Sequence, residues 1–201
     1  MKNYKKNDPI VISEGNSKIG KIPNVSLPPS ASCNNDLPCK KDGCYSEKAL
    51  RRFESVRLAR SHNWRVWKKE PNRYFKDIED FLQAEEPAYF RFHVDGDIPS
   101  QDYLNRMIKL ARNHKETRFL AFTKKFQLDF SNCPENLIII PSAWPKMNLP
   151  KSLWVHNLAW MQDGREDRNQ RAYFECHKHC DECYACWHID RIGRDVLFAK
   201  H

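Results

Sequence analysis

The sequence predicts an α/β protein, an incomplete or irregular TIM-like barrel of parallel strands with cysteine-rich loops at both ends of the chain. Two segments, 118–122 and 136–140, are apolar on both faces. Strands of that kind belong to parallel sheets covered by other layers. A strand, a helix and a further strand follow one another from residue 88, which is the order of α/β architecture. Few helical patterns follow residue 125, and this disfavours a regular eight-fold barrel.

The first part of the chain is expected to be extended and then helical. Residues 1–32 are interrupted by prolines and glycines, which break helices. A cysteine loop follows over 33–44. Apolar residues recurring at a spacing of three predict a helix over 46–69, and a second helical pattern predicts another over 72–84.

The rest of the chain is expected to alternate strands with one helix. Residues 88–94 alternate as a strand does and end at the turn Asp95-Gly96-Asp97. Ser100 is suited to cap a helix over 101–114. The remaining predicted strands are 118–122, 136–140, 153–158 and 195–199. We therefore expect an extended segment over 1–32 and a single α/β domain over 33–201.

The composition is that of a globular protein with an excess of positive charge. The 201 residues carry a formal net charge of +8. No apolar run approaches the ~18–20 residues that span a membrane, and the basic start lacks the apolar stretch of a signal peptide. We therefore expect a cytoplasmic protein without a membrane partner. In that reducing compartment the closely spaced cysteines among its eight are expected to bind metal rather than to form disulfides.

Four cysteines lie close together near the end of the chain: Cys176, Cys180, Cys183 and Cys186. Their short gaps let the backbone wrap one metal centre with amides aimed at the sulfurs. A four-cysteine zinc site usually has two separated pairs, whereas these pairs are fused, which favours an iron–sulfur cluster. Zinc is the alternative metal, because His177 and His179 could replace thiolates as ligands. The domain over 33–201 is therefore expected to hold a [4Fe–4S] cluster.

A second group of cysteines lies near the start: Cys33, Cys39 and Cys44. Three thiolates on a [4Fe–4S] cluster would leave one iron open to a small-molecule ligand or to a side chain from elsewhere. These residues could instead complete the C-terminal site, or be ordinary buried thiols. One or two clusters are therefore expected. Cys133 stands alone, and a structural thiol is favoured over a ligand there.

Several short motifs, in order, resemble the phage gene product 88 family. They begin with Asn16-Ser17-Lys18-Ile19-Gly20 and Leu27-Pro28-Pro29, and the resemblance covers about residues 15–200. The later matches are Cys33, Cys39, Cys44-Tyr45, Arg91-Phe92-His93, Gly96-Asp97, Tyr103-Leu104, Thr123-Lys124 and Cys183-x2-Cys186-Trp187. If the protein is viral, its expected location is the host cytoplasm.

The resemblance implies an iron–sulfur protein with a barrel-like fold similar to that of radical S-adenosylmethionine enzymes. S-adenosylmethionine is then a candidate cofactor, with Asp95, Gly96 and Asp97 as the turn that would hold its amine. Those enzymes use a CxxxCxxC motif after the first strand, whereas the gaps around Cys39 are five and four residues. An ordinary loop with positive φ at Gly96 is the alternative for this turn.

The candidate catalytic residues are His93, Asp97 and Lys124, which would face one mouth of the barrel. His93 could transfer protons or coordinate metal, and Lys124 could hold an anionic ligand. The expected function is a redox or radical-type iron–sulfur enzyme with a small-molecule ligand. The alternative is a non-catalytic nucleic-acid-binding accessory protein with a structural cluster or zinc. In that case the basic helix over 46–69, with Trp64 and Trp67, would contact phosphates and bases.

Overall fold

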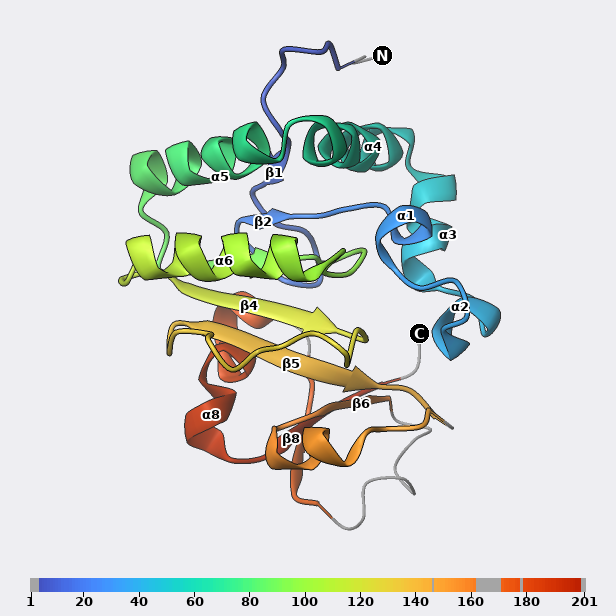
Figure 1. The fold of residues 1–201 in the computed structure, drawn as a ribbon. Coiled ribbons are helices and arrows are strands. Elements are labelled where there is room, and N and C mark those ends of the chain that lie inside the picture. Colours follow the sequence, from blue (N-terminus) through green and yellow to red (C-terminus); the bar gives the residue numbers. More distant parts are fainter. Residues whose placement is uncertain (1–3, 146, 162–170, 178, 200–201) are drawn as a thin grey trace.

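The computed structural model describes residues 4–145, 147–161, 171–177 and 179–199 and shows a mixed α/β fold (Figure 1). Eight strands form one sheet in the order β1-β2-β3-β4-β5-β6-β8-β7. Only the β1–β2 pairing is antiparallel among the described strand pairs. The strands are β1 (Ile12–Ser13), β2 (Asn24–Val25), β3 (Tyr89–Phe92), β4 (Arg118–Thr123), β5 (Leu137–Ala143), β6 (Ala159–Met161), β7 (Tyr173–Glu175) and β8 (Asp195–Phe198).

The centre of the sheet confirms the predicted parallel α/β architecture. Strands β3, β4 and β5 run side by side in register, with Phe92 beside Ala121 and Ala121 beside Ile139. Leu120 and Phe119 are both fully buried although they point to opposite faces of β4. The strand is therefore covered on both sides, as its continuous apolar sequence predicts.

Helices from the first half of the chain cover one face of the sheet (Figure 1). Trp67 of α4 packs edge-on against Tyr103 of α6 at 4.7 Å between ring centroids, and the Tyr103 and Tyr74 hydroxyls are hydrogen-bonded at 3.0 Å. Ser100 caps α6 as predicted, its hydroxyl accepting from the Tyr103 amide. These helices are α3 (Tyr45–Arg52), α4 (Glu54–Lys69), α5 (Pro71–Glu85) and α6 (Gln101–Asn113).

Two predicted elements are wrong in detail. The helix expected over 46–69 is broken at Phe53, whose backbone is extended (φ −120°, ψ 103°) and whose side chain is exposed, so that α3 and α4 are separate. The strand expected over 153–158 is instead the 3-10 helix η1 (Lys151–Val155), and the strand β6 begins only at Ala159. Pro150 precedes η1, and its fixed φ suits the start of a helical turn.

Short elements from the two ends of the chain lie around the sheet: α1 (Pro29–Ser32) and α2 (Pro38–Lys41) lie beside α3, and α8 (Ile189–Ile192) lies on the far side of β4 and β5 from α6 (Figure 1). In the segment 1–32, strand β2 pairs with β3 and so extends the central sheet. The cysteine-bearing helices are α2, α7 (Cys180–Cys183) and the 3-10 helix η3 (Ala185–His188). Along the chain, α1 precedes α2, and α8 follows η3. Trp187 of η3 is fully buried in a second apolar cluster beneath the sheet, with Leu120 and Ile140.

The two ends of the chain meet directly. The His179 amide donates to the Lys18 carbonyl at 3.1 Å, and the Lys21 amide donates to the Asp181 carboxylate at 3.0 Å. Gly20 has a φ of +66°, and any Cβ there would overlap the Asp181 carboxylate. The N-terminal turn is therefore shaped to receive the start of α7.

A buried carboxylate holds β6 and β8 together. Asp195 of β8 accepts from the Leu158 amide at 3.0 Å and from the Trp160 indole at 2.7 Å. Arg171 donates to the same carboxylate through Nε at 2.7 Å, which supplies the counter-charge that a buried carboxylate requires. Within the described ranges, no helix has the length and apolar character needed to cross a membrane.

Candidate functional site

A cavity of about 160 Å³ lies at the carboxyl ends of the parallel strands. This is the edge at which open α/β sheets bind ligands. Residues that follow or end β3, β4, β5, β6 and β8 all line it, together with cysteines from both ends of the chain. The volume far exceeds the ~10–15 Å³ that one buried water needs. The cavity can therefore hold a small molecule or a polynuclear metal centre.

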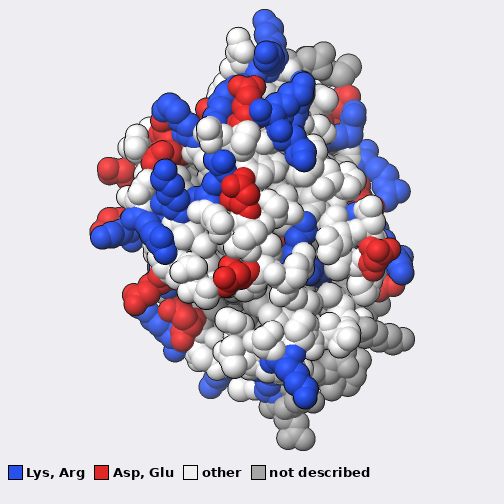
Figure 2. All heavy atoms as spheres, viewed as in Figure 1, with Lys and Arg blue, Asp and Glu red and all other residues white. Residues whose placement is uncertain are grey.

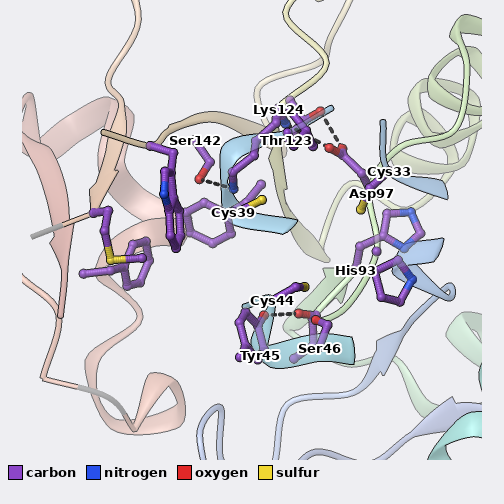
Figure 3. Close-up of a pocket in the computed structure, with 18 of the residues that line it drawn as sticks. Cys33, Cys39, Cys44, Tyr45, Ser46, His93, Asp97, Thr123, Lys124 and Ser142 are labelled. Carbon is purple, nitrogen blue, oxygen red and sulfur yellow. Dashed lines mark hydrogen bonds between the residues drawn. The ribbon is translucent and has the colours of Figure 1, made fainter. Parts of the chain in front are cut away.

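The three N-terminal cysteines, Cys33, Cys39 and Cys44, all line this cavity (Figure 3). Cys33 follows α1, Cys39 lies in α2, and Cys44 precedes the first residue of α3. Burial raises the pKa of Cys33 to about 12, while the charge of Lys124 opposes that rise. Burial also raises the pKa of Cys39, again against the charge of Lys124. A thiolate at either position therefore needs a compensating cation or metal.

The C-terminal cysteines reach the same cavity from the other end of the chain. Cys176 follows β7 and Cys180 begins α7, and both line the cavity. Cys183 is exposed, and Cys186 in η3 is half-buried against the second apolar cluster, the one that contains Trp187. Burial raises the pKa of Cys186 to about 12, the charge of Arg91 opposes that rise, and the other three thiols add to it.

The donor set fits a thiolate-bound metal centre. Thiolates select zinc and iron–sulfur clusters among biological metals. Over the described residues, no three His, Cys, Asp or Glu side chains converge to hold a single ion. A polynuclear cluster attaches each cysteine to a different iron, so its sulfurs stand further apart than the ligands of one ion.

Cys133 lies apart from both cysteine groups. It is half-buried against the main apolar core beneath the helices and does not line the cavity. Burial is the largest cause that raises its pKa, to about 11. This environment matches the structural thiol that the sequence favours.

The two carboxylates in the turn after β3, Asp95 and Asp97, have different partners. Asp95 does not line the cavity; it is ion-paired with Arg60 and hydrogen-bonded by Ser46. Gly96 and Asp97 do line the cavity. Gly96 has a φ of +85°, and a Cβ there would lie 2.5 Å from the Leu27 carbonyl oxygen. The turn is therefore held by both α3–α4 and the segment before α1.

Asp97 positions the end of β4. Its carboxylate accepts from the Thr123 hydroxyl at 2.6 Å and from the Lys124 amide at 2.9 Å. Burial raises the pKa of Asp97, and these hydrogen bonds oppose the rise. The Lys124 ammonium then reaches into the cavity, where it donates to the Ser142 hydroxyl at 3.0 Å (Figure 3).

His93 is the cavity residue with the most unusual environment. It is only 2% exposed, and neither ring nitrogen has a hydrogen-bond partner. Its backbone has a φ of 60°, a left-handed conformation that is uncommon for a residue other than glycine. Burial and the nearby charges of Arg91 and Lys125 lower its pKa to about 3, so the imidazole is neutral near pH 7.

Two cations that line the cavity were not singled out as candidates from the sequence. Arg91, in the middle of β3, is 9% exposed and points away from the helix-covered core. Lys18 lies with its ammonium 4.9 Å from the Tyr45 ring centroid. Alternation along β3 could have identified Arg91, because the residues on either side of it are buried phenylalanines. No local pattern predicts the placement of Lys18, which depends on the fold of the N-terminal segment.

The predicted basic helix is present as α3 and α4, with its tryptophans turned inward. Trp67 is buried, and Trp64 packs against the main apolar core. Lysine and arginine side chains gather over α4, with acidic side chains among them (Figure 2). The exposed positive charge could contact phosphates, but these two rings are not placed to stack on bases. Nucleic-acid binding stays a prediction.

Comparison with known proteins yields one family. The sequence model described as Gene product 88 matches residues 2–189, which is nearly the whole chain. No curated protein and no solved structure matches the chain.

Proposed function

The chain belongs to the gene product 88 family, and we propose that it is an iron–sulfur protein whose cysteine-lined cavity is a site of redox or radical-type chemistry on a small molecule. One observation supports this most strongly: cysteines from both ends of the chain, far apart in sequence, line the same cavity, namely Cys33, Cys39, Cys44, Cys176 and Cys180. Cys183 and Cys186 lie outside the lining but follow Cys180 at the short spacing from which a cluster takes its ligands.

The C-terminal group would hold one [4Fe–4S] cluster, with Cys176, Cys180, Cys183 and Cys186 as its ligands. Cys33, Cys39 and Cys44 would hold a second cluster or share the first. A bound cluster supplies one-electron transfer, at a potential set by burial and by hydrogen bonds to the sulfurs. Zinc in place of iron would make the same cysteines a structural site.

The candidate catalytic residues supply acid–base and positioning chemistry around the cavity. The neutral His93 imidazole offers a ligand one hydrogen-bond donor and one acceptor, and its proton-transfer role requires a bound ligand or metal centre to raise its pKa from about 3. Asp97 holds Lys124 through its backbone amide, and the Lys124 ammonium is aimed at the cavity. His93 and Lys124 would act on the ligand directly, and Asp97 would be a positioning residue.

An incomplete barrel is the finer description of the fold that we propose. Strands β3, β4, β5, β6 and β8 contribute residues to one cavity, and this supports a sheet that curves around it. An experimental structure with a flat sheet, in which the ends of β3 and β8 lie far apart, would contradict that description.

The metal is tested by anaerobic purification followed by iron, sulfide and zinc analysis. We expect iron and sulfide in equal amounts and absorbance near about 400 nm, as is general for iron–sulfur charge transfer. The matched variants are Cys33/Cys39/Cys44 to alanine and Cys176/Cys180 to alanine, with Cys133→Ala as the control.

The outcomes separate the alternatives. Two clusters predict that each group variant keeps part of the iron, whereas one shared cluster predicts that either variant loses all of it. Cys133→Ala should retain the full metal content. Zinc without sulfide, or iron that is unchanged in both group variants, would refute the iron–sulfur proposal.

S-adenosylmethionine is the finer cofactor proposal, with Gly96 and Asp97 at the cavity. Adding it to the reduced protein should change the cluster's EPR spectrum, and Asp97→Asn should weaken that change. A spectrum that does not respond, together with an absence of cleavage products, would rule out this version while leaving the iron–sulfur proposal intact.

A further inference from the structure

The cavity contains a buried arginine without a charged partner. On β3, Phe90 and Phe92 face the core beneath the helices, so the intervening Arg91 faces the cavity. The Arg91 Nε has no hydrogen-bond partner, and the guanidinium lies 5.0 Å from the Phe122 ring centroid. Among the salt bridges of the described residues, none involves Arg91 or Lys124.

The two carboxylates of the turn after β3 already have partners of their own. Asp95 is paired with Arg60 on the helix side of the turn. The Asp97 oxygens accept hydrogen bonds from Thr123 and from the backbone of residues 98 and 124. Burying a charge without a counter-charge is costly, so a cavity of this kind favours an anionic occupant.

Two further groups make the cavity suited to an anion that also accepts or donates hydrogen bonds. Lys124 is fixed at the end of β4 by Asp97, and its ammonium keeps donors beyond the one used on Ser142. His93 is buried with both ring nitrogens unsatisfied. In Figure 3 it lies on the same side of the cavity as Cys33 and Asp97.

We propose that the cavity binds a small molecule through an oxyanion group, a carboxylate or a phosphate, held by Arg91 and Lys124 with His93 as a hydrogen-bonding partner. The planar guanidinium can hold two oxygens of such a group at once, and the lysine adds a point charge. Lys18 adds a third cationic side chain to the lining, and burial, together with the charge of Arg91, lowers its pKa. This inference does not depend on the identity of the metal.

A rival explanation assigns the same cations to the cysteines. Arg91 opposes the pKa rise of Cys180 and Cys186, and Lys124 opposes that of Cys33. In that case the cations would serve only to balance metal-bound thiolates. The two explanations differ in what happens to metal content when one cation is removed.

The test is calorimetric titration of the anaerobically purified full chain with inorganic phosphate and, separately, with acetate. We expect saturable binding of at least one probe at one site, and the preferred probe identifies the source of the oxyanion. Arg91→Gln and Lys124→Met should each weaken binding about tenfold or more, the usual effect of losing a charge-assisted hydrogen bond. His93→Gln should weaken it less.

Lys125→Met is the control, because it removes one positive charge next to Lys124. The Lys125 ammonium donates to the Pro99 carbonyl and does not line the cavity, so binding should be unchanged. Circular dichroism checks that each variant is folded, and Arg91→Lys, which keeps the charge, replaces Arg91→Gln if that variant is not. Metal analysis of the same samples should show wild-type content in the cation variants.

Three results would overturn the proposal. The first is an absence of saturable binding of either probe to the wild type. The second is equal weakening by Lys125→Met, which would indicate a general effect of net charge. The third is loss of metal together with loss of binding in Arg91→Gln or in Lys124→Met. That result would show that the removed cation serves to balance the charge of metal-bound thiolates.

Discussion

Replacing Gly96 by alanine should destabilise the protein more than the same change at any open left-handed glycine. Gly96 has a φ of +85°, and its position is closed on two sides. A Cβ would lie 2.5 Å from the Leu27 carbonyl oxygen and 2.6 Å from the Ser32 hydroxyl. The Ser32 hydroxyl also accepts the Asp97 amide, so the collision falls on the contact that joins α1 to the cavity turn.

The magnitude has two parts. A left-handed backbone costs an alanine about 1–2 kcal/mol relative to glycine. Forcing a methyl group against a fixed backbone oxygen adds about 1–3 kcal/mol, as overpacking does elsewhere. We therefore expect Gly96→Ala to lower the free energy of unfolding by about 2–5 kcal/mol.

Gly193 provides the matched control. It has a φ of +65°, and a Cβ there would meet nothing within 4 Å, so only the backbone cost applies. Urea denaturation followed by far-UV circular dichroism should show a loss of about 1–2 kcal/mol for Gly193→Ala. Equal losses for the two variants would refute the reasoning, because they would show that the close approach to Leu27 and Ser32 carries no energetic cost.

Three further predictions concern charge. Burial lowers the pKa of His93 to about 3, whereas the unfolded chain titrates near 6.5, so the unfolded state binds more protons between these values. The free energy of unfolding should therefore fall by up to ~1.4 kcal/mol for each pH unit below pH 6.5. In urea melts at several pH values, His93→Gln should flatten this dependence of stability on pH. An unchanged pH dependence in the variant would contradict the burial argument. Asp195→Asn leaves Arg171 without its buried partner and should cost about 3–5 kcal/mol by the same assay; a loss below 1 kcal/mol would show that solvent already screens the pair. If the exposed charge on α4 binds nucleic acid, retention of the protein on immobilised DNA should fall steeply between about 50 and 200 mM salt. Reversing the charge at Arg57, Arg65 and Lys69 together should abolish the retention. No retention of the wild type at low salt would remove this prediction.

The sequence predicts the long, strongly patterned elements of the fold well. The strands β3, β4 and β5 and the helices α5 and α6 lie where the apolar periodicity places them. The break at Phe53 is hidden because the helical periodicity continues on both sides of it. The η1 segment is apolar and short, and such runs do not distinguish a strand from a helical turn.

The candidate site is predictable in its chemistry and less so in its geometry. The spacing of the cysteines predicts that they are metal ligands, which stays a prediction, and five of them line the cavity together with Gly96 and Asp97. The commitment of Asp95 to Arg60 depends on a helix more than thirty residues earlier in the chain, which no local pattern reveals. Alternation along β3 does predict that Arg91 faces away from the helix-covered core, but its lack of a salt bridge within the described residues is a property of the packed cavity.

The contact between the Lys18 carbonyl and the amide of His179 bears on the order of events during synthesis. Residues 16–21 leave the ribosome about 160 residues ahead of their partners around α7. Contacts between such distant segments form slowly, because a long loop must close first. The nascent chain therefore carries Cys33, Cys39 and Cys44 for much of its synthesis before the opposite wall of the cavity exists. Any metal delivery that needs both walls must wait until α7 has been made.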